Sequence, residues 1–327
     1  MSARQTVFMF SGQGSQYYQM GRELFEKDVE FRSLLMQCDE VARPFIQNSI
    51  VDTIYSEIAK STPFDSVVLT TSAILAIEVS LATYLIRRGI KPDLLIGYSL
   101  GEFSASVIAN VMSFKDAVLV LTQFGQAINE TTCAAGLLAV VDTPHLISRH
   151  PELFGSCWLT GINFNRNFVM GGRLADIDTL ERQLVSAGVL CQRLPVKIGF
   201  HTPLMETVKE IFYDLMGGLD YSVPEVPIIS TVSRREIGAT SAQEWVNHFW
   251  KVTREYVNFK QTLEDLPLNS GAHLIDVGPS GTLATFVNYL QLPINDLEVS
   301  QTLNPFGQNV SSIEKTIELN KRFTRKI

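Results

Sequence analysis

Short apolar runs alternate along this chain with longer stretches in which apolar residues recur at helical spacing. Four of the runs are typical of buried strands: Thr6–Phe10, Leu94–Ile96, Val226–Val232 and Ala272–Val277. Helical spacing from Thr71 to Arg88 predicts a long, largely buried helix that ends at Gly89. Strands that alternate with helices indicate an α/β fold with a parallel sheet, in which sites form at the carboxyl ends of strands.

Other helical patterns surround these strands. They predict helices from about Tyr18 to Ala59, one helical stretch around Trp245 to Leu263, and a terminal helix over Ser312–Phe323. A turn at Gly278–Gly281 follows the last of the four strands. The outer parts of the chain therefore read as one large α/β unit.

The pattern changes between about Ala134 and Lys197, where the predicted elements become short and closely spaced. They are a strand over 136–141, a helix over 144–154, strands over 157–163 and 168–171, a helix over 175–187 and a strand over 189–196. This order matches a ferredoxin-like unit, which can be inserted into a larger domain. We therefore expect a large domain over residues 1–132 and 198–327 and a small subdomain over residues 133–197.

The apolar run before Gly97 leads into a Gly-Tyr-Ser-Leu-Gly pentapeptide, and residues 102–109 read as the first turns of a helix. This is the context of a nucleophile elbow, a sharp turn that raises a serine hydroxyl above the end of a strand. Glycines on both sides of the serine allow the turn. Ser99 is therefore a candidate nucleophile, although the pentapeptide alone also fits a plain turn with a capping serine.

Composition narrows the class of protein. Of 327 residues, 46% are hydrophobic and 19% are charged, and the net charge is -7. That charge argues against nucleic-acid binding, which usually needs a basic stripe. The N-terminus lacks the pattern of a signal peptide, and the apolar segment after it is too short to span a membrane.

The cysteines have neither the spacing of a metal site nor that of a disulfide framework. They are Cys38, Cys133, Cys157 and Cys191. We expect reduced, mostly buried thiols and a cytoplasmic protein without a metal site.

Four motifs follow one another along the chain: Gly12–Gln16, Gly97–Glu102, Phe200-His201 and Asp276–Pro279. In order and spacing they resemble the malonyl-CoA:acyl carrier protein transacylases and the acyltransferase domains of polyketide synthases. The resemblance spans nearly the whole chain, including the ferredoxin-like unit. It implies a large α/β-hydrolase-like domain with a parallel sheet plus an inserted small ferredoxin-like subdomain.

The resemblance implies roles for single residues. Ser99 matches the nucleophile that takes the acyl group from a thioester, and His201 matches the general base that a serine hydroxyl needs. The remaining histidines match no catalytic position and are expected on the surface or in packing: His145, His150, His248 and His273.

In this family main-chain carbonyls orient the histidine, so no triad aspartate is expected. By its place in the chain, Val252–Arg254 resembles the segment that supplies such a carbonyl. The oxyanion donors should be the backbone N–H groups of Gln13 and Leu100, and the second also follows from elbow geometry. Gln13 as an ordinary loop residue is the alternative. No cofactor is expected, because the phosphopantetheine arrives on the carrier protein substrate.

Family members that use malonyl groups carry an arginine on the helix after the elbow, and its guanidinium binds the malonyl carboxylate. Matching the glycine of that pattern to Gly125 puts Phe124 at the arginine position, and a slip of one residue would put Gln123 there. Neither side chain replaces a bidentate charge pair, so a buried malonyl carboxylate would lack its countercharge, at a cost on the order of several kcal/mol. The alternatives are a compensating arginine, such as Arg166 or Arg193, and a larger error in the match of the motif.

Two further residues are expected to shape the acyl pocket. Tyr98 stands where the family usually has histidine and alters the wall beside Ser99. Phe200 precedes the catalytic histidine, as in malonyl-type extender domains, but it also fits a small pocket. We interpret Phe124, Gln123, Tyr98 and Phe200 together as substrate-binding residues for neutral, short acyl groups.

The sequence lacks the arginine but keeps the nucleophile, the base and the oxyanion donors. In this combination it resembles the stand-alone acyl hydrolases of trans-acyltransferase polyketide synthases. The expected function is hydrolysis of acyl thioesters on acyl carrier proteins through a Ser99 acyl-enzyme, which releases stalled acyl groups. An acyl-CoA:acyl carrier protein acyltransferase, for malonyl or another acyl group, is one alternative. A non-catalytic module that binds carrier proteins is another. The expected partners are acyl carrier proteins of a polyketide synthase and acyl thioesters, with no nucleic acid and no membrane.

Overall fold

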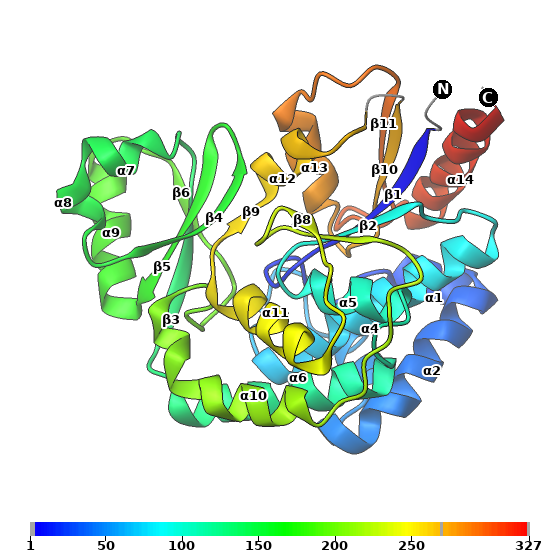
Figure 1. Ribbon diagram of the computed structural model, residues 1–327, viewed down its shortest axis with the longest axis horizontal. Helices are drawn as coiled ribbons and strands as arrows, with labels where there is room; N and C mark the ends of the chain where they lie inside the picture. The colour runs from blue at the N-terminus through cyan, green and yellow to red at the C-terminus, as the bar shows by residue number, and fades with distance from the viewer. Residues whose placement is uncertain (1–3, 269–270, 326–327) are drawn as a thin grey trace.

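Within residues 4–268 and 271–325, which the computed structural model describes, the strands form a large and a small sheet (Figure 1). The strands are β1 (Gln5–Phe10), β2 (Leu94–Gly97), β3 (Ala135–Val140), β4 (Trp158–Phe164), β5 (Asn167–Arg173), β6 (Cys191–Arg193), β7 (Ile228–Ser230), β8 (Arg235–Glu236), β9 (Val257–Asn258), β10 (Ala272–Asp276) and β11 (Leu297–Gln301). The helices are α1 (Arg22–Lys27), α2 (Val29–Ile46), α3 (Ile50–Ile54), α4 (Val67–Arg87), α5 (Gly101–Ile108), α6 (Phe114–Thr131), α7 (His145–Arg149), α8 (Pro151–Phe154), α9 (Leu174–Ser186), the 3₁₀ helix η1 (Pro203–Val208), α10 (Lys209–Gly217), α11 (Ala242–Arg254), α12 (Phe259–Asp265), α13 (Thr282–Leu290) and α14 (Asn309–Arg325). The fold is therefore of the mixed α/β class.

The large sheet has the strand order β11-β10-β1-β2-β7-β8. Neighbouring strands from β11 to β7 run parallel, and β8 pairs antiparallel with β7. Phe10 at the end of β1 lies opposite Gly97 at the end of β2. The carboxyl ends of these two strands therefore meet, which brings the glycine-rich loop after β1 next to the elbow after β2.

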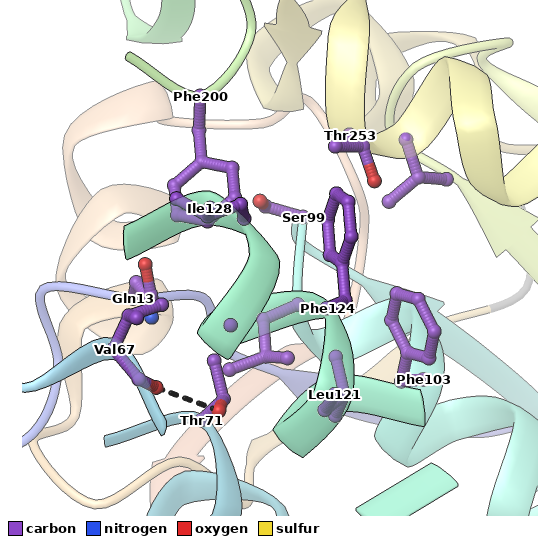
Figure 2. Close-up of a pocket in the computed structure, with 13 residues that line it drawn as sticks. Gln13, Val67, Thr71, Ser99, Phe103, Leu121, Phe124, Ile128, Phe200 and Thr253 are labelled. Carbon is purple, nitrogen blue, oxygen red and sulfur yellow. Dashed lines mark hydrogen bonds between the residues drawn. The ribbon is translucent and has the colours of Figure 1, made fainter. Parts of the chain in front are cut away.

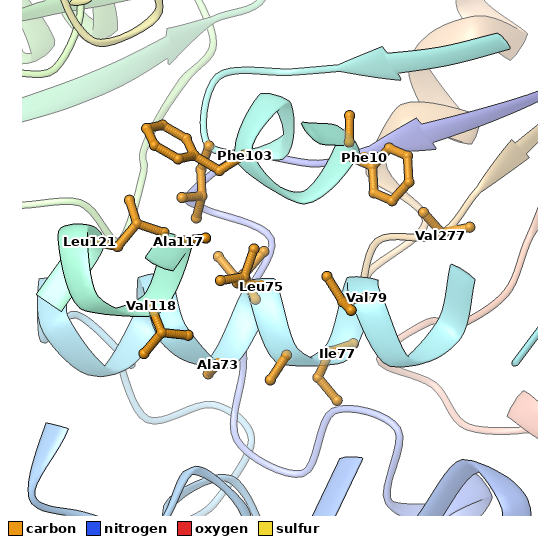
Figure 3. Packing of buried hydrophobic residues seen from close by; sticks show 14 of the residues in the cluster. Phe10, Ala73, Leu75, Ile77, Val79, Phe103, Ala117, Val118, Leu121 and Val277 are labelled. Carbon is orange, nitrogen blue, oxygen red and sulfur yellow. The ribbon is translucent and has the colours of Figure 1, made fainter. Parts of the chain in front are cut away.

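Alternate residues of β1 pack into two different cores, as expected for a strand covered on both faces. Phe8 and Phe10 join a cluster with residues of α2, α4, α5 and α6. Val7 and Met9 join a second cluster with residues of α12 and α13. Figure 3 shows part of the first cluster, where Leu75 of α4 lies beneath α5 and the end of β1. Burial of both faces fixes the register of β1 and with it the position of the loop that follows.

Helix α4 forms the centre of the first cluster and is buried along most of its length. It begins at Val67, earlier than the apolar pattern predicts, and ends at Arg87, just before Gly89. Among the described residues it is the helix whose length and composition would also suit a membrane span, but 83% of that window is buried inside the protein. Packing against α2, α5 and α6 accounts for its apolar faces.

The small sheet has the strand order β6-β3-β5-β4-β9. Strands β6, β3, β5 and β4 are antiparallel neighbours, in the order that a ferredoxin-like unit has. One face carries a separate apolar cluster with residues of α7, α8 and α9, including Leu138, Phe168 and Leu180. Leu137 and Val169 on the other face join the first cluster of the large unit. The small sheet thus packs against the part of the fold that holds the elbow.

Strand β9 joins the small sheet from outside residues 133–197, because Gly161 and Ile162 of β4 pair with Val257 and Asn258. The apolar pattern gives no sign of this pairing. The boundaries at residues 132/133 and 197/198 stay a prediction, as does the likeness of the large unit to an α/β-hydrolase.

The prediction of one helical stretch around Trp245 to Leu263 is wrong. Helix α11 ends at Arg254, the chain is extended at Glu255, and α12 begins only after β9. Asn258 restarts the helix, because its side chain accepts a hydrogen bond from the backbone N–H of Gln261. Both helices bury apolar residues, so the spacing of those residues does not reveal the break.

Candidate active site

Ser99 lies in the turn between β2 and α5 with a φ of 54°, in the left-handed region that non-glycine residues rarely adopt. The glycines on either side allow segments to approach closely. A Cβ at Gly97 would lie 2.4 Å from the Cα of Glu102, and one at Gly101 would lie 2.1 Å from the carbonyl oxygen of Phe10. Neither position has room for a side chain, so the two glycines hold the elbow in its sharp form.

His201 lies beside the serine and is 8% exposed. Its Nε2 is 2.8 Å from the Ser99 Oγ, and its Nδ1 is 2.7 Å from the carbonyl oxygen of Glu255. A carbonyl only accepts, so Nδ1 carries the proton and Nε2 is free to accept from the serine hydroxyl. Burial lowers the pKa of His201 to about 4. The ring is therefore neutral near pH 7, the state a general base needs.

The expected position of the orienting carbonyl is wrong by one residue. The carbonyl that holds the His201 ring belongs to Glu255, not to Val252–Arg254. The carbonyl of Thr253 instead accepts from the backbone N–H of His201, at 2.9 Å. Because α11 ends at Arg254 and Glu255 is extended, its carbonyl leaves the helical direction and becomes available to the ring.

The structure brings Gln13 and Leu100 to the same cavity as Ser99. A Cβ on Gly12 would lie 2.9 Å from the carbonyl oxygen of Tyr98, so the glycine-rich loop packs directly on the elbow. Within the described part of the chain, the backbone N–H groups of Gln13 and Leu100 donate no hydrogen bond to protein. Two unused donors beside a serine hydroxyl suit the stabilisation of a developing oxyanion.

A buried carboxyl group that the motifs do not predict anchors the glycine-rich loop. Oε1 of Glu78 on α4 accepts from the backbone N–H of Ser11 at 2.6 Å and from its hydroxyl at 2.7 Å. The chain of contacts continues to the Ser15 hydroxyl, which donates to the carbonyl of Gly12. Burial raises the pKa of Glu78 to about 8 and that of nearby Asp276 to about 6. A glutamate in an apolar helical pattern is the signal that could have revealed this anchor.

A cavity of about 40 Å³ opens beside Ser99. Figure 2 shows Phe124 and Phe200 on opposite sides of the serine. None of the described residues that line the cavity is charged: Gln13, Val67, Thr71, Ser99, Leu100, Phe103, Leu121, Phe124, Gly125, Ile128, Phe200, Val252 and Thr253. The cavity is thus small and largely apolar.

Gln123 and Tyr98 do not line this cavity. Gln123 is exposed, whereas its neighbour Phe124 is buried and packs edge-on against Phe212 with ring centroids 4.8 Å apart. Of the two candidates for the arginine position, Phe124 lines the cavity and Gln123 does not.

Tyr98 lines a larger cavity of about 320 Å³ between the glycine-rich loop, the small sheet and α13. Its hydroxyl donates to the Oδ1 of Asn163 on β4 at 2.7 Å. Tyr98 also lines a second small cavity together with Ser99 and His201, so it does lie beside the nucleophile, on the side away from Phe124.

Neither arginine considered as a replacement reaches the small cavity. Arg193 lines the larger one, and its guanidinium pairs with Asp178 and Glu181. Arg166 is exposed. Among the described residues, no cation stands in for the missing arginine of the malonyl-type pattern.

The remaining polar candidates lie elsewhere. His145 and His150 are exposed, and His273 is buried against Ser300 and Asn320. His248 contacts Glu102. No group of three or more histidine, cysteine, aspartate or glutamate side chains that could hold a metal ion occurs in the described residues.

All four cysteines are free, but the expectation of mostly buried thiols is wrong. Cys133 is exposed, and the other three are half-buried: Cys38, Cys157 and Cys191. Cys38 lies within α2, Cys133 and Cys157 lie just before β3 and β4, and Cys191 begins the edge strand β6.

Residues 7–296 match the family model described as an acyl transferase domain. The polyketide biosynthesis acyltransferase homolog PksD of Bacillus subtilis (strain 168) is 35% identical over 98% of this chain and 98% of that protein. The acyltransferase domain from the second module of the salinomycin polyketide synthase has a TM-score of 0.80 and 26% identity, over 96% of this chain and 72% of that chain. A complex of a type II polyketide synthase acyl carrier protein with its malonyl-transacylase contains the same fold, with a TM-score of 0.82 and 20% identity over 96% of this chain and 99% of that chain. Family model and full-length relative both span most of the sequence, so the chain belongs to the acyl transferase domain family of polyketide biosynthesis.

Proposed function

We propose that the chain hydrolyses short, neutral acyl thioesters on acyl carrier proteins through an acyl-enzyme at Ser99, and so releases stalled acyl groups in polyketide biosynthesis. One observation carries the proposal. The hydrogen-bonded Ser99–His201 pair lies beside a small cavity, and none of the described residues that line this cavity is charged. Nucleophile and base are retained, whereas a countercharge for a malonyl carboxylate is missing.

Acylation begins with the serine hydroxyl. His201 Nε2 takes the proton of Ser99 as its Oγ attacks the thioester carbonyl, and the Glu255 carbonyl stabilises the ring through Nδ1–H. The backbone N–H groups of Gln13 and Leu100 stabilise the oxyanion. The carbon–sulfur bond then breaks, the thiolate takes the proton from His201, and the acyl group remains as an ester on Ser99.

Deacylation reverses the roles of the groups. His201 removes a proton from water, the hydroxide oxygen attacks the ester, and the Ser99 oxygen leaves with the proton from His201. The product is a free acid. A second cavity of about 40 Å³, lined by Ser99, His201, Leu137 and Val169 among others, is large enough for this water.

The larger cavity at Tyr98 suits the arm of a carrier protein, because it reaches the glycine-rich loop from the side of the small sheet. The solved complex of a malonyl-transacylase with its carrier protein supports carrier proteins as partners for this fold. Acyltransferase domains of this family act without a cofactor, and the phosphopantetheine belongs to the carrier protein. A cytoplasmic location, in line with four free cysteines, is part of the proposal.

The lining of the acyl cavity supports neutral acyl groups over malonate. A malonyl carboxylate in that cavity would be desolvated without a countercharge, and the penalty for such an ion is several kcal/mol. Acetyl and propionyl groups carry no charge, and a small apolar cavity suits short acyl groups of this kind.

Chemical labelling tests the nucleophile. A fluorophosphonate should label the protein once, and Ser99→Ala should remove the label. Absence of labelling in the wild-type protein would instead favour a non-catalytic module that binds carrier proteins. His150→Leu, at an exposed histidine whose ring contacts Glu152 away from the cavity, serves as the control that keeps full labelling.

An acyltransferase is the second candidate function, because the matching family model and PksD are both described as acyltransferases or their homologs. Incubation of acyl-loaded carrier protein with and without an unloaded holo carrier protein separates the two activities. Hydrolysis predicts free acid in both cases at similar rates. Transfer predicts acyl groups on the second carrier protein, and no release of acid when that acceptor is omitted.

A further inference from the structure

Glu102, one residue beyond Gly101 of the elbow, is fully buried. Its Oε1 accepts from the hydroxyl of Ser230 at 2.8 Å and from the backbone N–H of Thr231 at 3.1 Å, both at the end of β7. Its Oε2 lies 2.7 Å from Nε2 of His248 on α11. This carboxyl group therefore connects the helix behind the nucleophile with a helix from a distant part of the chain.

The same helix α11 also reaches the base. At its C-terminal end, the carbonyl of Thr253 accepts from the His201 backbone, and the next but one carbonyl, of Glu255, accepts from the His201 ring. His248 and Glu255 are seven positions apart, or about 10 Å along a helix at the usual rise. A closed ring of contacts thus links the nucleophile to the base. It runs from Ser99 along α5 to Glu102, across to His248, and along α11 to Glu255 and His201. The 2.8 Å hydrogen bond between His201 and Ser99 closes it.

We infer that His248 is a positioning residue. By holding α11 against Glu102 on α5, it keeps the Glu255 carbonyl, and so the His201 ring, aimed at Ser99. This inference rests on the proposed function, because it assigns His248 an effect on the chemical step of a Ser99 acyl-enzyme.

The surroundings of His248 favour a positioning role over simple space filling. Its ring packs edge-on against Trp245 and Phe249, and these contacts restrict the side chain. The His248 side chain is 11% exposed and lines an open cavity of about 510 Å³ that does not include Ser99, so solvent reaches it without entering the acyl site. Loss of its N–H would leave a buried carboxyl oxygen without its donor, and α11 would be free to move relative to α5.

Two substitutions separate positioning from packing. His248→Phe keeps the ring that packs on Trp245 and Phe249 but removes the N–H, whereas His248→Gln keeps an N–H donor of similar reach. We expect His248→Phe to lower kcat for deacylation of acetyl-carrier protein about 10- to 100-fold with KM within about two-fold, because a misplaced base slows chemistry more than binding. His248→Gln should restore most of kcat.

A wild-type kcat in folded His248→Phe, or equal losses in the Phe and Gln variants, would overturn the inference. If His248→Phe does not fold, His248→Asn takes its place, because its shorter amide does not reach Glu102, and it must show the same drop. His150→Leu, at an exposed histidine–glutamate contact, is the matched control with unchanged kcat. Fluorophosphonate labelling of the wild-type protein separates failure of the proposed function from failure of this inference. If the wild-type protein is not labelled, the Ser99 acyl-enzyme itself is refuted. If it is labelled and the kcat of His248→Phe is unchanged, only the role of His248 is refuted.

Discussion

The two residues of the candidate pair both have positive φ, 54° at Ser99 and 63° at His201. For non-glycine residues this backbone strain costs on the order of 1–3 kcal/mol each, and it persists only where neighbours fix the conformation. Gly97 and Gly101 do so for the serine, and the Thr253 and Glu255 carbonyls do so for the histidine. The backbone strain thus lies at the two residues whose side chains must stay within hydrogen-bond distance of each other.

The pH dependence of serine labelling follows from the burial of His201. With a pKa of about 4, the ring is neutral above that value and protonated below it. The fluorophosphonate rate should stay nearly constant from about pH 8 to pH 6 and fall about ten-fold per unit below about pH 4. A midpoint near the ordinary histidine value of about 6.5 would contradict this expectation. Tryptophan fluorescence at each pH ensures that the protein is folded.

A charge exchange at the cavity tests the role of Phe124. Phe124→Arg should raise the deacylation rate of malonyl-carrier protein and lower that of acetyl-carrier protein, because the guanidinium supplies the missing countercharge. Gln123→Arg is the matched control, since this neighbouring side chain is exposed and outside the cavity. No gain for malonyl in Phe124→Arg, or an equal gain in Gln123→Arg, would show that the cavity does not select by charge.

At the residue scale, motifs locate Ser99, His201, Gln13 and Leu100 because each lies in a short pattern of fixed spacing. Phe124 and Gln123 stay alternatives in the sequence, and only side-chain burial separates them. The carbonyl partner of His201 is missed by one residue because every residue has a carbonyl, and the sequence does not say where a helix releases one.

At the scale of elements, the turn between β2 and α5 and the break between α11 and α12 carry the site. The first is readable because glycines mark it. The second is not, because Glu255 and Val257 have no special turn chemistry and the break depends on pairing of β9 with β4. Strand β11 and helix α13 also lack a distinct pattern, and their packing on β10 determines them.

An added methyl group at Gly101 tests whether the sharp turn between β2 and α5 needs a glycine. Gly101→Ala would put a Cβ 2.1 Å from the carbonyl oxygen of Phe10, so β1 and α5 must separate. We expect loss of at least about 100-fold in the labelling rate of Ser99, since a shift of about 1 Å costs that much. Gly217→Ala, where no atom lies within 4 Å of the added Cβ, should label like the wild type. Normal labelling in Gly101→Ala would refute the elbow geometry.

At the scale of the whole molecule, two sheets meet around the site. Three buried carboxyl groups, of Glu78, Glu102 and Asp276, accept hydrogen bonds from the loops at the carboxyl ends of the large sheet. The order of motifs predicts the family, and the short elements of residues 133–197 predict a ferredoxin-like order, which the observed strand order has. Long-range contacts such as Glu78 with Ser11 and Glu102 with His248 join segments far apart in sequence, so a single sequence without partners does not show them.

The stability of the molecule should depend on pH through Glu78. Its folded pKa of about 8 lies above the ordinary value of 4.5, so the folded protein holds a proton that the unfolded chain has lost. The free energy of unfolding should therefore fall as pH rises from about 5 to about 8, by at most about 1.4 kcal/mol per unit.

Glu78→Gln keeps an oxygen that accepts from Ser11 and removes the titration. Urea unfolding at pH 5, 6, 7 and 8 should give a flatter curve for Glu78→Gln than for the wild type between pH 6 and 8. Asp276, whose pKa is about 6, changes the stability of both proteins alike, mainly below pH 6. Parallel curves for the two proteins would mean that Glu78 does not hold its proton in the folded state.

Hydrolysis of loaded carrier proteins tests the central claim most directly. A polyketide synthase carrier protein carrying acetyl or malonyl is incubated with the enzyme in buffer without any acceptor thiol, and intact-mass spectrometry follows loss of the acyl group. We predict release of acetyl at a rate well above that of malonyl and above that of Ser99→Ala. Release confined to malonyl, or no release without an acceptor thiol, would contradict the account.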